Sequence, residues 1–375
     1  MLFSPYLLAL SAALAIRDEA KPVKFGLSKG TRQEPITSGR SFRAAPGAQE
    51  SNLWVDGFFY LIDVDIGNQG QKVSVEIDTG SADLWVDKRI VQDVSTWKNL
   101  SEPYSVWYYD HTSVQGWYGT SPIWLDNGLK IDDFQWALGT NVTHNTGNFH
   151  GILGVGRVEN ESAKNRYPNL VQKLKDDGII KTNGYSYYLN SKDATSGSIV
   201  FGGIDKAKIK GDVATVPLTT GTANSRFDNI HISKITGVDG EVLGENIEAF
   251  LDTGLTVSRL PPNIVDQIRA KVPNAVIDGS ITWVPCELDP NLYVSFWFND
   301  VEIKLSLNDL SIKSYNNDGK PNGKCVLGVQ PTSNGVPVHL GVSTLTHAYV
   351  TINHDENVAL ISNVNYTDEE DIVLL

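Results

Sequence analysis

Short stretches in which apolar and polar residues alternate dominate the chain from Leu53 onward. Examples are the runs at 57–67 (GFFYLIDVDIG), 72–78 (KVSVEID), 198–204 (SIVFGGI) and 294–307 (VSFWFNDVEIKLSL), which are separated by Gly, Asn, Asp and Pro. A period of two in segments rich in β-branched and aromatic residues is typical of strands bounded by turns. The sequence therefore predicts an all-β architecture.

Helical periodicity is confined to a few short segments. In 167–178 (YPNLVQKLKDDG), Pro168 suits a first helical position and Gly178 suits the exit. The segment 261–272 (PPNIVDQIRAKV) begins in the same way at Pro261. We therefore expect only small helices among the strands.

The first 15 residues form an apolar run that ends in Ala13-Leu14-Ala15, and the first charge follows at Arg17. This arrangement is typical of a secretory signal peptide, and the run is too short to span a bilayer. A buried N-terminal helix is the alternative. We predict a signal peptide over 1–15 and a secreted, extracellular protein, with the vacuole as a second destination.

The chain has 375 residues, 41% of them hydrophobic, and a net charge of −13, so it can bury a large core in two lobes. Its acidity argues against nucleic acid as a partner. Residues 17–43, in contrast, carry seven Lys or Arg and three Asp or Glu. We interpret 16–50 as a prosegment held partly by charge and ending in an exposed linker at 44–50. The alternative is a solvated, disordered basic arm.

Secretion also gives meaning to the cysteines and the sequons. Cys286 and Cys325 are the only two cysteines of the chain, and in an oxidising compartment they are most simply a disulfide. Four N-x-S/T sequons are candidates for glycosylation, at Asn99, Asn141, Asn160 and Asn365.

An Asp-Thr-Gly motif closes an apolar run twice in the chain. Asp78-Thr79-Gly80 is followed downstream by Ile152-Leu153-Gly154, and Asp252-Thr253-Gly254 is followed by His339-Leu340-Gly341. A duplicated structural half explains this order better than chance. We therefore expect an N-terminal lobe over 51–192 and a C-terminal lobe over 193–375.

Two strand-end carboxylates, one from each half, can meet across a pseudo-two-fold axis. Such a pair cannot ionise twice without cost, so it holds one proton over a broad acid range. One member can then take a proton from a water while the other protonates a carbonyl oxygen. The glycines bring backbone N–H groups close to the carboxylates, and the threonines can hydrogen-bond across the junction.

The segments EIDTGSADLWV, FHGILGVG, GSIVFGGID and AFLDTGLTVSRLP, with the late cysteine pair, resemble the pepsin-like aspartic proteases. The likeness is nearest to the secreted yeast enzymes of the candidapepsin type, and it runs from about Leu53 to Asn365. It implies a bilobal β fold with a cleft between the lobes and hydrolysis of extended protein and peptide substrates at acid pH. It also implies pepstatin-type inhibition, a monomer, and no cofactor. We expect no metal site, because the chain lacks an H-E-x-x-H motif or a Cys/His cluster.

The resemblance also assigns roles to individual residues. Asp78 and Asp252 match the catalytic pair, and Ser81 matches the hydroxyl that hydrogen-bonds the first aspartate. A β-hairpin flap is expected to cover the cleft, with Tyr108 near its tip and Trp85 as the hydrogen-bonding neighbour of that tyrosine. The remaining candidates are the supporting residues Thr79, Gly80, Thr253 and Gly254 and the substrate-binding residues Tyr109, Asp110, Phe149, Ile152 and Thr256. For Phe149 and Ile152, an ordinary core position is an equal alternative.

Three features depart from the family pattern. Leu255 stands where a Ser or Thr usually follows the second Asp-Thr-Gly, so we expect altered titration of the pair. Tyr109 and His111 stand where the flap favours glycine. Glu76 shares a strand face with Asp78, and it would favour a basic side chain on the amino side of the cut, unless a twist turns it to water.

Two further expectations concern the ends of the chain. KPVKFGL (21–27) resembles the first strand of family prosegments. The C-terminal NYTDEEDIVLL lacks the spacer and apolar tail of a lipid-anchor signal, so no membrane anchor is expected.

A catalytically silent pepsin-fold protein that binds peptides, proteins or glycans is the alternative to an active protease.

Overall fold

The computed structural model describes residues 20–36, 53–67, 70–108, 112–125, 128–143, 150–219, 226–315, 320–332 and 337–375. The predicted signal peptide and the linker at 44–50 lie outside these residues. The same holds for Tyr109, Asp110 and His111 of the predicted flap and for Phe149. No helix in the described part of the chain is long and apolar enough to cross a membrane.

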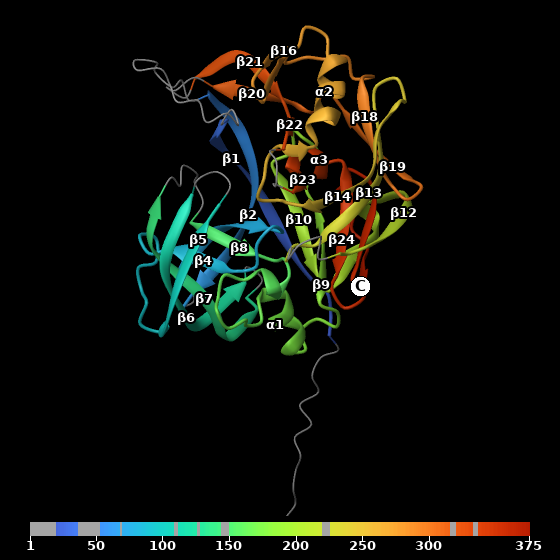
Figure 1. Ribbon diagram of the computed structural model, residues 1–375. Helices are drawn as coiled ribbons and strands as arrows, with labels where there is room; N and C mark the ends of the chain where they lie inside the picture. The colour runs from blue at the N-terminus through green and yellow to red at the C-terminus, as the bar shows by residue number, and fades with distance from the viewer. Residues whose placement is uncertain are drawn as a thin grey trace, which may run out of the picture.

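The described chain is mostly β-sheet with a few short helices, as the sequence predicted, and the strands form two units (Figure 1). The strands of the first unit are β2 (Leu53–Ile66), β3 (Lys72–Asp78), β4 (Leu84–Asp87), β5 (Lys98–Trp107), β6 (Ser113–Leu125), β7 (Lys130–Thr143) and β8 (Gly151–Gly154). The main sheet of the second unit contains β13 (Asn229–Thr236), β14 (Val242–Leu251), β15 (Ser258–Leu260), β18 (Tyr293–Phe298), β19 (Val301–Ser306), β22 (Val329–Pro331) and β23 (Val338–Leu340). Four further strands of the second half lie outside this sheet and connect to β2 through β20: β16 (Val276–Asp278), β17 (Ile281–Val284), β20 (Ser311–Tyr315) and β21 (Pro321–Leu327).

Six antiparallel strands join these two units. In spatial order they are β1 (Val23–Ile36), β10 (Ser196–Phe201), β9 (Gly184–Tyr188), β24 (Ala348–Asn353), β25 (Val358–Val364) and β12 (Ile209–Pro217). The β9–β10 hairpin spans the predicted lobe boundary at 192/193, so both lobes contribute strands to this central sheet. The boundary itself stays a prediction.

Part of the basic leader is an ordered strand of this sheet. In β1, Phe25 pairs with Ile199 and Leu27 with Gly197, and both β1 side chains are buried in the main core beside Tyr60. Alternating burial of apolar side chains fixes the register of such a strand. The alternative of a disordered basic arm is therefore wrong for this part of the leader.

The helices begin later than the sequence predicted. They are α1 (Leu170–Asp176), α2 (Pro262–Ala270) and α3 (Val342–Leu345), with 3₁₀ turns η1 (Val158–Asn160) and η2 (Lys206–Lys208). The predicted start of α1 at Pro168 is wrong, because Asn169 is the N-cap and accepts a hydrogen bond from the backbone N–H of Gln172 at 3.2 Å. The predicted start of α2 at Pro261 is wrong by one residue, because Pro262 takes the first helical position that proline suits.

A disulfide and a small two-stranded sheet each join segments of the second half that are distant in sequence. Cys286 and Cys325 form a disulfide, which confirms that prediction. Near the C-terminus, β26 (Ile372–Leu374) pairs with β11 (Gly203–Asp205).

Candidate active site

Each Asp-Thr-Gly motif lies where a strand leaves the sheet and the chain crosses over a second strand. In the first half, β3 runs parallel to β8, with Asp78 opposite Gly154, and β4 returns antiparallel to β8. In the second half, β14 runs parallel to β23, with Leu251 opposite Leu340, and β15 returns antiparallel to β23. The two halves therefore build the same crossing twice, as a duplication requires.

The two threonines fasten one crossing to the other. The Thr79 N–H donates to Thr253 Oγ1 at 3.1 Å, and the Thr253 N–H donates to Thr79 Oγ1 at 3.0 Å. Each hydroxyl then donates across the junction, Thr79 to the carbonyl of Leu251 at 2.7 Å and Thr253 to the carbonyl of Ile77 at 2.8 Å. These four bonds are buried, so the relative position of the loops is tightly determined.

The glycine of each motif lies close to both carboxylates, the one of its own loop and the one of the other loop. The Gly80 N–H donates to Asp78 Oδ1 at 2.7 Å, and the Gly254 N–H donates to Asp252 Oδ1 at 3.0 Å. A Cβ on Gly80 would lie 2.8 Å from Asp252 Oδ1, and one on Gly254 would lie 2.7 Å from Asp78 Oδ1. Only glycine therefore lets the two carboxyl groups share one site.

The environments of the two carboxyl groups differ. Ser81 Oγ donates to Asp78 Oδ2 at 2.5 Å, whereas Leu255 offers no hydroxyl to Asp252. Burial and the neighbouring charge of Asp78 raise the pKa of Asp252 well above its usual range, and the charge of Glu76 acts in the same direction. The Gly254 N–H opposes this shift. Asp252 is thus the member of the pair that retains a proton more strongly than an ordinary aspartic acid.

The hairpin of β5 and β6 carries Tyr108 at its end. The Tyr108 N–H donates to the carbonyl of Thr112 at 2.8 Å, and the Trp85 Nε1–H donates to the Tyr108 hydroxyl at 2.8 Å. This is the contact that the family resemblance led us to expect. The rings of Trp85 and Tyr108 also pack with centroids 6.4 Å apart, so the hairpin is fixed to the strand that follows the first Asp-Thr-Gly.

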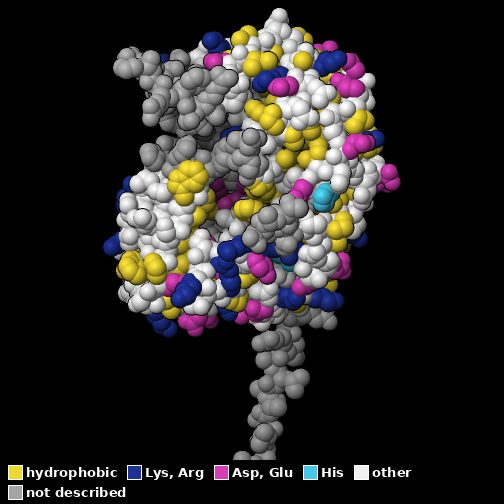
Figure 2. Space-filling model, viewed as in Figure 1, with side chains coloured by type: hydrophobic (Ala, Val, Ile, Leu, Met, Phe, Trp, Pro, Cys, Tyr) yellow, Lys and Arg dark blue, Asp and Glu magenta, His cyan; other side chains and the backbone are white. Residues whose placement is uncertain are grey.

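The other candidates of the first half lie beside this hairpin. Glu76 is only 1% exposed and pairs in register with Ile152, so the alternative in which it turns to water is wrong. Ile152 is buried in a cluster with Trp85 and Phe59. Figure 2 shows a hollow in the surface between the two units, with acidic side chains visible inside it.

Thr256 contacts the backbone of the first unit. It is fully buried, its Oγ1 accepts the Phe58 N–H at 2.9 Å, and its hydroxyl lies 3.3 Å from the Phe58 carbonyl. The hydroxyl is therefore occupied by the backbone of β2, and contact of Thr256 with substrate stays a prediction.

Two polar residues in contact with the region of the first loop escaped the sequence reasoning. Asp83 is buried behind the first loop and accepts hydrogen bonds at 2.8 Å from the hydroxyls of Tyr118 and Tyr167. The Asn160 Nδ2 donates to the carbonyl of Gly80 at 2.8 Å. A carboxylate inside the apolar run ADLWV was a visible signal for Asp83, whereas Asn160 carried only the signal of a sequon.

Two β lobes that each contribute an Asp-Thr-Gly loop to a shared carboxyl pair define the class of pepsin-like aspartic proteases. The comparisons with known proteins agree with this class. The model of the family "Eukaryotic aspartyl protease" matches residues 59–364. Candidapepsin-2 of Candida parapsilosis is 33% identical over 92% of this chain and 87% of its own. Secreted aspartic protease 4 of Candida albicans is 30% identical over 84% of this chain and 79% of its own.

The solved structure of the aspartic proteinase from Irpex lacteus has the same fold. Its TM-score is 0.70 at 20% identity, over 83% of this chain and 95% of that one. The chain therefore belongs to the eukaryotic aspartyl protease family, and its class of activity is that of a pepsin-like aspartic endopeptidase.

Proposed function

We propose that the protein hydrolyses peptide bonds of extended protein substrates at acid pH with Asp78 and Asp252 as the catalytic pair. The observation that carries this proposal is the reciprocal arrangement of the two loops, in which each glycine lies against the carboxylate of the other loop. The pair shares a hydrogen bond between its carboxyl groups, and the pKa of Asp252 is raised by burial and by Asp78.

The different hydrogen-bond donors around Asp78 and Asp252 assign the roles of base and acid. Asp78 receives bonds from Ser81 and Gly80, which favour its charged form, so it accepts a proton from the attacking water. The water oxygen bonds to the carbonyl carbon while Asp252 gives its proton to the carbonyl oxygen. As the C–N bond breaks, the amine takes the proton that Asp78 accepted, and a hydroxyl of the tetrahedral intermediate returns a proton to Asp252, which restores the pair. No covalent intermediate or cofactor enters this scheme.

Substrate is expected to lie beneath the β5–β6 hairpin, with Trp85 holding Tyr108 in place. Tyr109, Asp110 and Phe149 remain candidates for contact with substrate, as does Ile152, whose burial also suits the core alternative. We propose that Glu76 favours Lys or Arg on the amino side of the cut, because a buried carboxylate gains most from a cationic partner.

We also propose that the protein is secreted, acts as a monomer, and is inhibited by pepstatin. The apolar run over 1–15 supports secretion, as does the name of the similar Secreted aspartic protease 4 of Candida albicans. Under this proposal 16–50 is a removable prosegment, and 51–192 and 193–375 are the two lobes.

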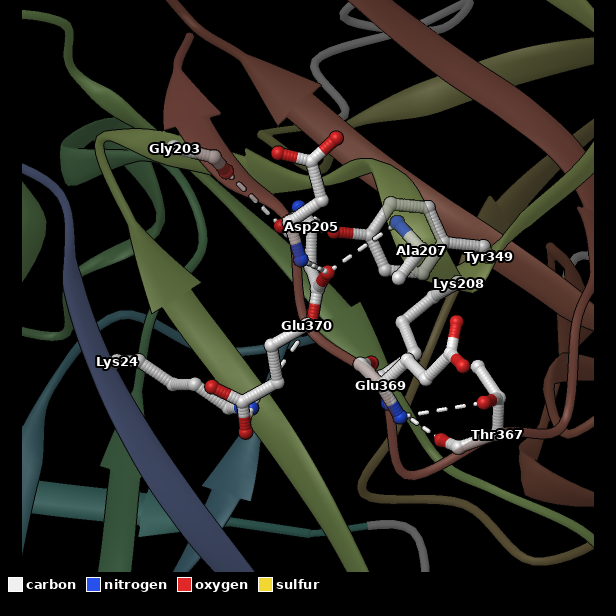
Figure 3. Close-up of polar contacts among 11 residues, drawn as sticks. Lys24, Gly203, Asp205, Ala207, Lys208, Tyr349, Thr367, Glu369 and Glu370 are labelled. Carbon is white, nitrogen blue, oxygen red and sulfur yellow. Dashed lines mark hydrogen bonds and ion pairs between the residues drawn. The ribbon is translucent and has the colours of Figure 1, made fainter.

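Near the start of the leader, Lys24 lies beside two acidic residues, one from β11 and one from the C-terminal segment (Figure 3). Lys24 forms an ion pair with Glu370, and its Nζ lies 3.9 Å from Oδ2 of the buried Asp205. The bond to Lys24 lowers the pKa of Glu370. Because a lowered carboxyl pKa contributes stability that is lost as pH falls, acid weakens the attachment of the leader.

Acid digestion of a denatured protein tests the proposal directly. The wild-type protein and its Asp78→Asn variant are compared with and without pepstatin. We expect cleavage that pepstatin blocks and that the substitution abolishes. Cleavage that survives the substitution, or a wild-type protein without activity, would contradict the proposed function.

A further inference from the structure

A strap formed by residues 156–167 lies along the back of the first catalytic loop. At its start, the Gly156 N–H donates to the Ser81 carbonyl at 2.9 Å. Further along, the Ser162 N–H donates to Asp83 Oδ2 at 2.8 Å. The strap is therefore attached on both sides of the position that Asn160 occupies.

Asn160 makes the central bond of this attachment. It ends η1, its side chain is half-buried, and its Nδ2 donates to the Gly80 carbonyl at 2.8 Å. The N–H of the same Gly80 donates to Asp78 Oδ1 at 2.7 Å. One glycine thus connects the Asn160 amide to the carboxylate that the proposed function uses as its base.

The strap is also held by hydrogen bonds that do not involve the first loop. Asn169 Nδ2 donates to the Gly156 carbonyl at 2.7 Å, and the buried Glu161 accepts the Tyr167 N–H at 2.9 Å. A side chain held in this way fixes the orientation of the group that it contacts.

We propose that Asn160 is a positioning residue for the active site. Its bond to Gly80 holds the glycine where its N–H faces Asp78 and its Cα passes beside Asp252. Without that bond the backbone at Gly80 is less constrained, so its N–H can move away from Asp78, which then loses a donor that stabilises its charged form. This role rests on the proposed function, since it concerns the same carboxyl pair.

The sequon at Asn160 gives this proposal a further consequence. The other sequon residues Asn99, Asn141 and Asn365 are exposed, whereas the Asn160 amide is engaged with the catalytic loop. A glycan on Asn160 would have to share the nitrogen that contacts Gly80. Asn141 is therefore a matched control, because its substitution removes an amide and a sequon from an exposed strand.

The test uses Asn160→Ala and Asn160→Asp, with Asn141→Ala and Asn141→Asp as controls, in the full chain. Activity on a peptide substrate is measured from pH 2.5 to 6, and folding is checked at each pH by tryptophan fluorescence. For Asn160→Ala we expect kcat to fall roughly tenfold, the order of one lost hydrogen bond, with KM little changed.

Asn160→Asp provides a readout that a loss of stability would not produce. The introduced carboxyl can donate to the Gly80 carbonyl while it is protonated, but an ionised carboxylate cannot donate. Activity should therefore approach that of wild type at the acid end and fall toward that of Asn160→Ala as the carboxyl ionises.

Two results would overturn the role of Asn160. One is a kcat for folded Asn160→Ala equal to that of Asn141→Ala. The other is a pH profile of Asn160→Asp that has the same shape as that of wild type. The wild-type arm separates the two proposals, because an inactive wild type refutes the proposed function, whereas an active wild type with unchanged Asn160 variants refutes only the positioning role.

Discussion

Glu161 should limit the stability of the protein toward neutral pH. Its side chain is 1% exposed, and burial raises its pKa to about 8, with the charge of Asp83 acting in the same direction. The Tyr167 N–H and the charge of Arg166 oppose the shift without cancelling it. The folded protein therefore keeps this carboxyl neutral at a pH where the unfolded chain ionises it.

The sign and size of the effect follow from this difference. Because the folded pKa is raised, the unfolded state releases its proton first, so stability is unaffected below pH 4.5 and falls between pH 4.5 and about 8. Each pKa unit corresponds to about 1.4 kcal/mol. Glu161 alone should then remove on the order of 3 kcal/mol of unfolding free energy between pH 4 and pH 7.

Glu161→Gln removes the ionisation and keeps the acceptor for the Tyr167 N–H. Urea unfolding at pH 4 and pH 7, followed by tryptophan fluorescence, gives the free energies of unfolding. All variants carry Asp78→Asn so that self-digestion does not distort the curves. We expect Glu161→Gln to be close to its parent at pH 4 and to lose on the order of 3 kcal/mol less by pH 7.

Glu159→Gln is the matched control, since Glu159 lies two residues away in the same strap and is exposed. It should leave the pH dependence unchanged. If Glu161→Gln and Glu159→Gln lost equal stability between pH 4 and pH 7, the reasoning from burial would be refuted.

Three other predictions concern specificity, titration and the leader. Glu76→Val should reduce the preference for Lys or Arg over Leu on the amino side of the cut by roughly tenfold in a peptide-library digest, and an unchanged preference would exclude the pocket role. Leu255→Thr adds a hydroxyl that can donate to Asp252, so the pH–rate profile should move to lower pH, and a profile that superimposes on that of wild type would contradict the assigned asymmetry. Glu370→Gln removes the carboxylate that pairs with Lys24, so in protein cleaved between leader and body the leader should dissociate at a higher pH in native mass spectra recorded over a pH series, whereas an unchanged release would show that the ion pair does not hold it.

The sequence predicted those features of the site that depend on residues close together in the chain or on a single possible pairing. The Asp-Thr-Gly loops, Ser81 and the disulfide follow from short motifs whose residues act on near neighbours or in an obvious pair. Family resemblance supplied the contact between Trp85 and Tyr108, which joins distant residues but follows a repeated pattern.

The parts that distant segments decide could not be predicted. Asn160 and Asp83 make their contacts only because the chain returns behind the first loop after β8, and no periodicity in the sequence indicates that return. Thr256 follows a catalytic loop in sequence, yet its hydroxyl is used by the backbone of Phe58, which lies 198 residues earlier. For Glu76, alternation fixed the face but not the burial, because a twist of the strand would have exposed it.

The two Asp-Thr-Gly loops have the same strand arrangement but differ in the side chains that surround them. Behind the first, the strap supplies Asn160, and Ser81 adds a hydroxyl to Asp78. At the second, Leu255 contributes a backbone carbonyl that accepts the Val342 N–H at 2.8 Å but no side-chain donor for the carboxylate. Donors gathered on one side of a shared proton bias it toward the other side, so under the proposed function Asp78 carries the charge and Asp252 carries the proton before substrate binds. A duplication that began with equal halves can thus divide the work of acid and base through single substitutions outside the Asp-Thr-Gly motif.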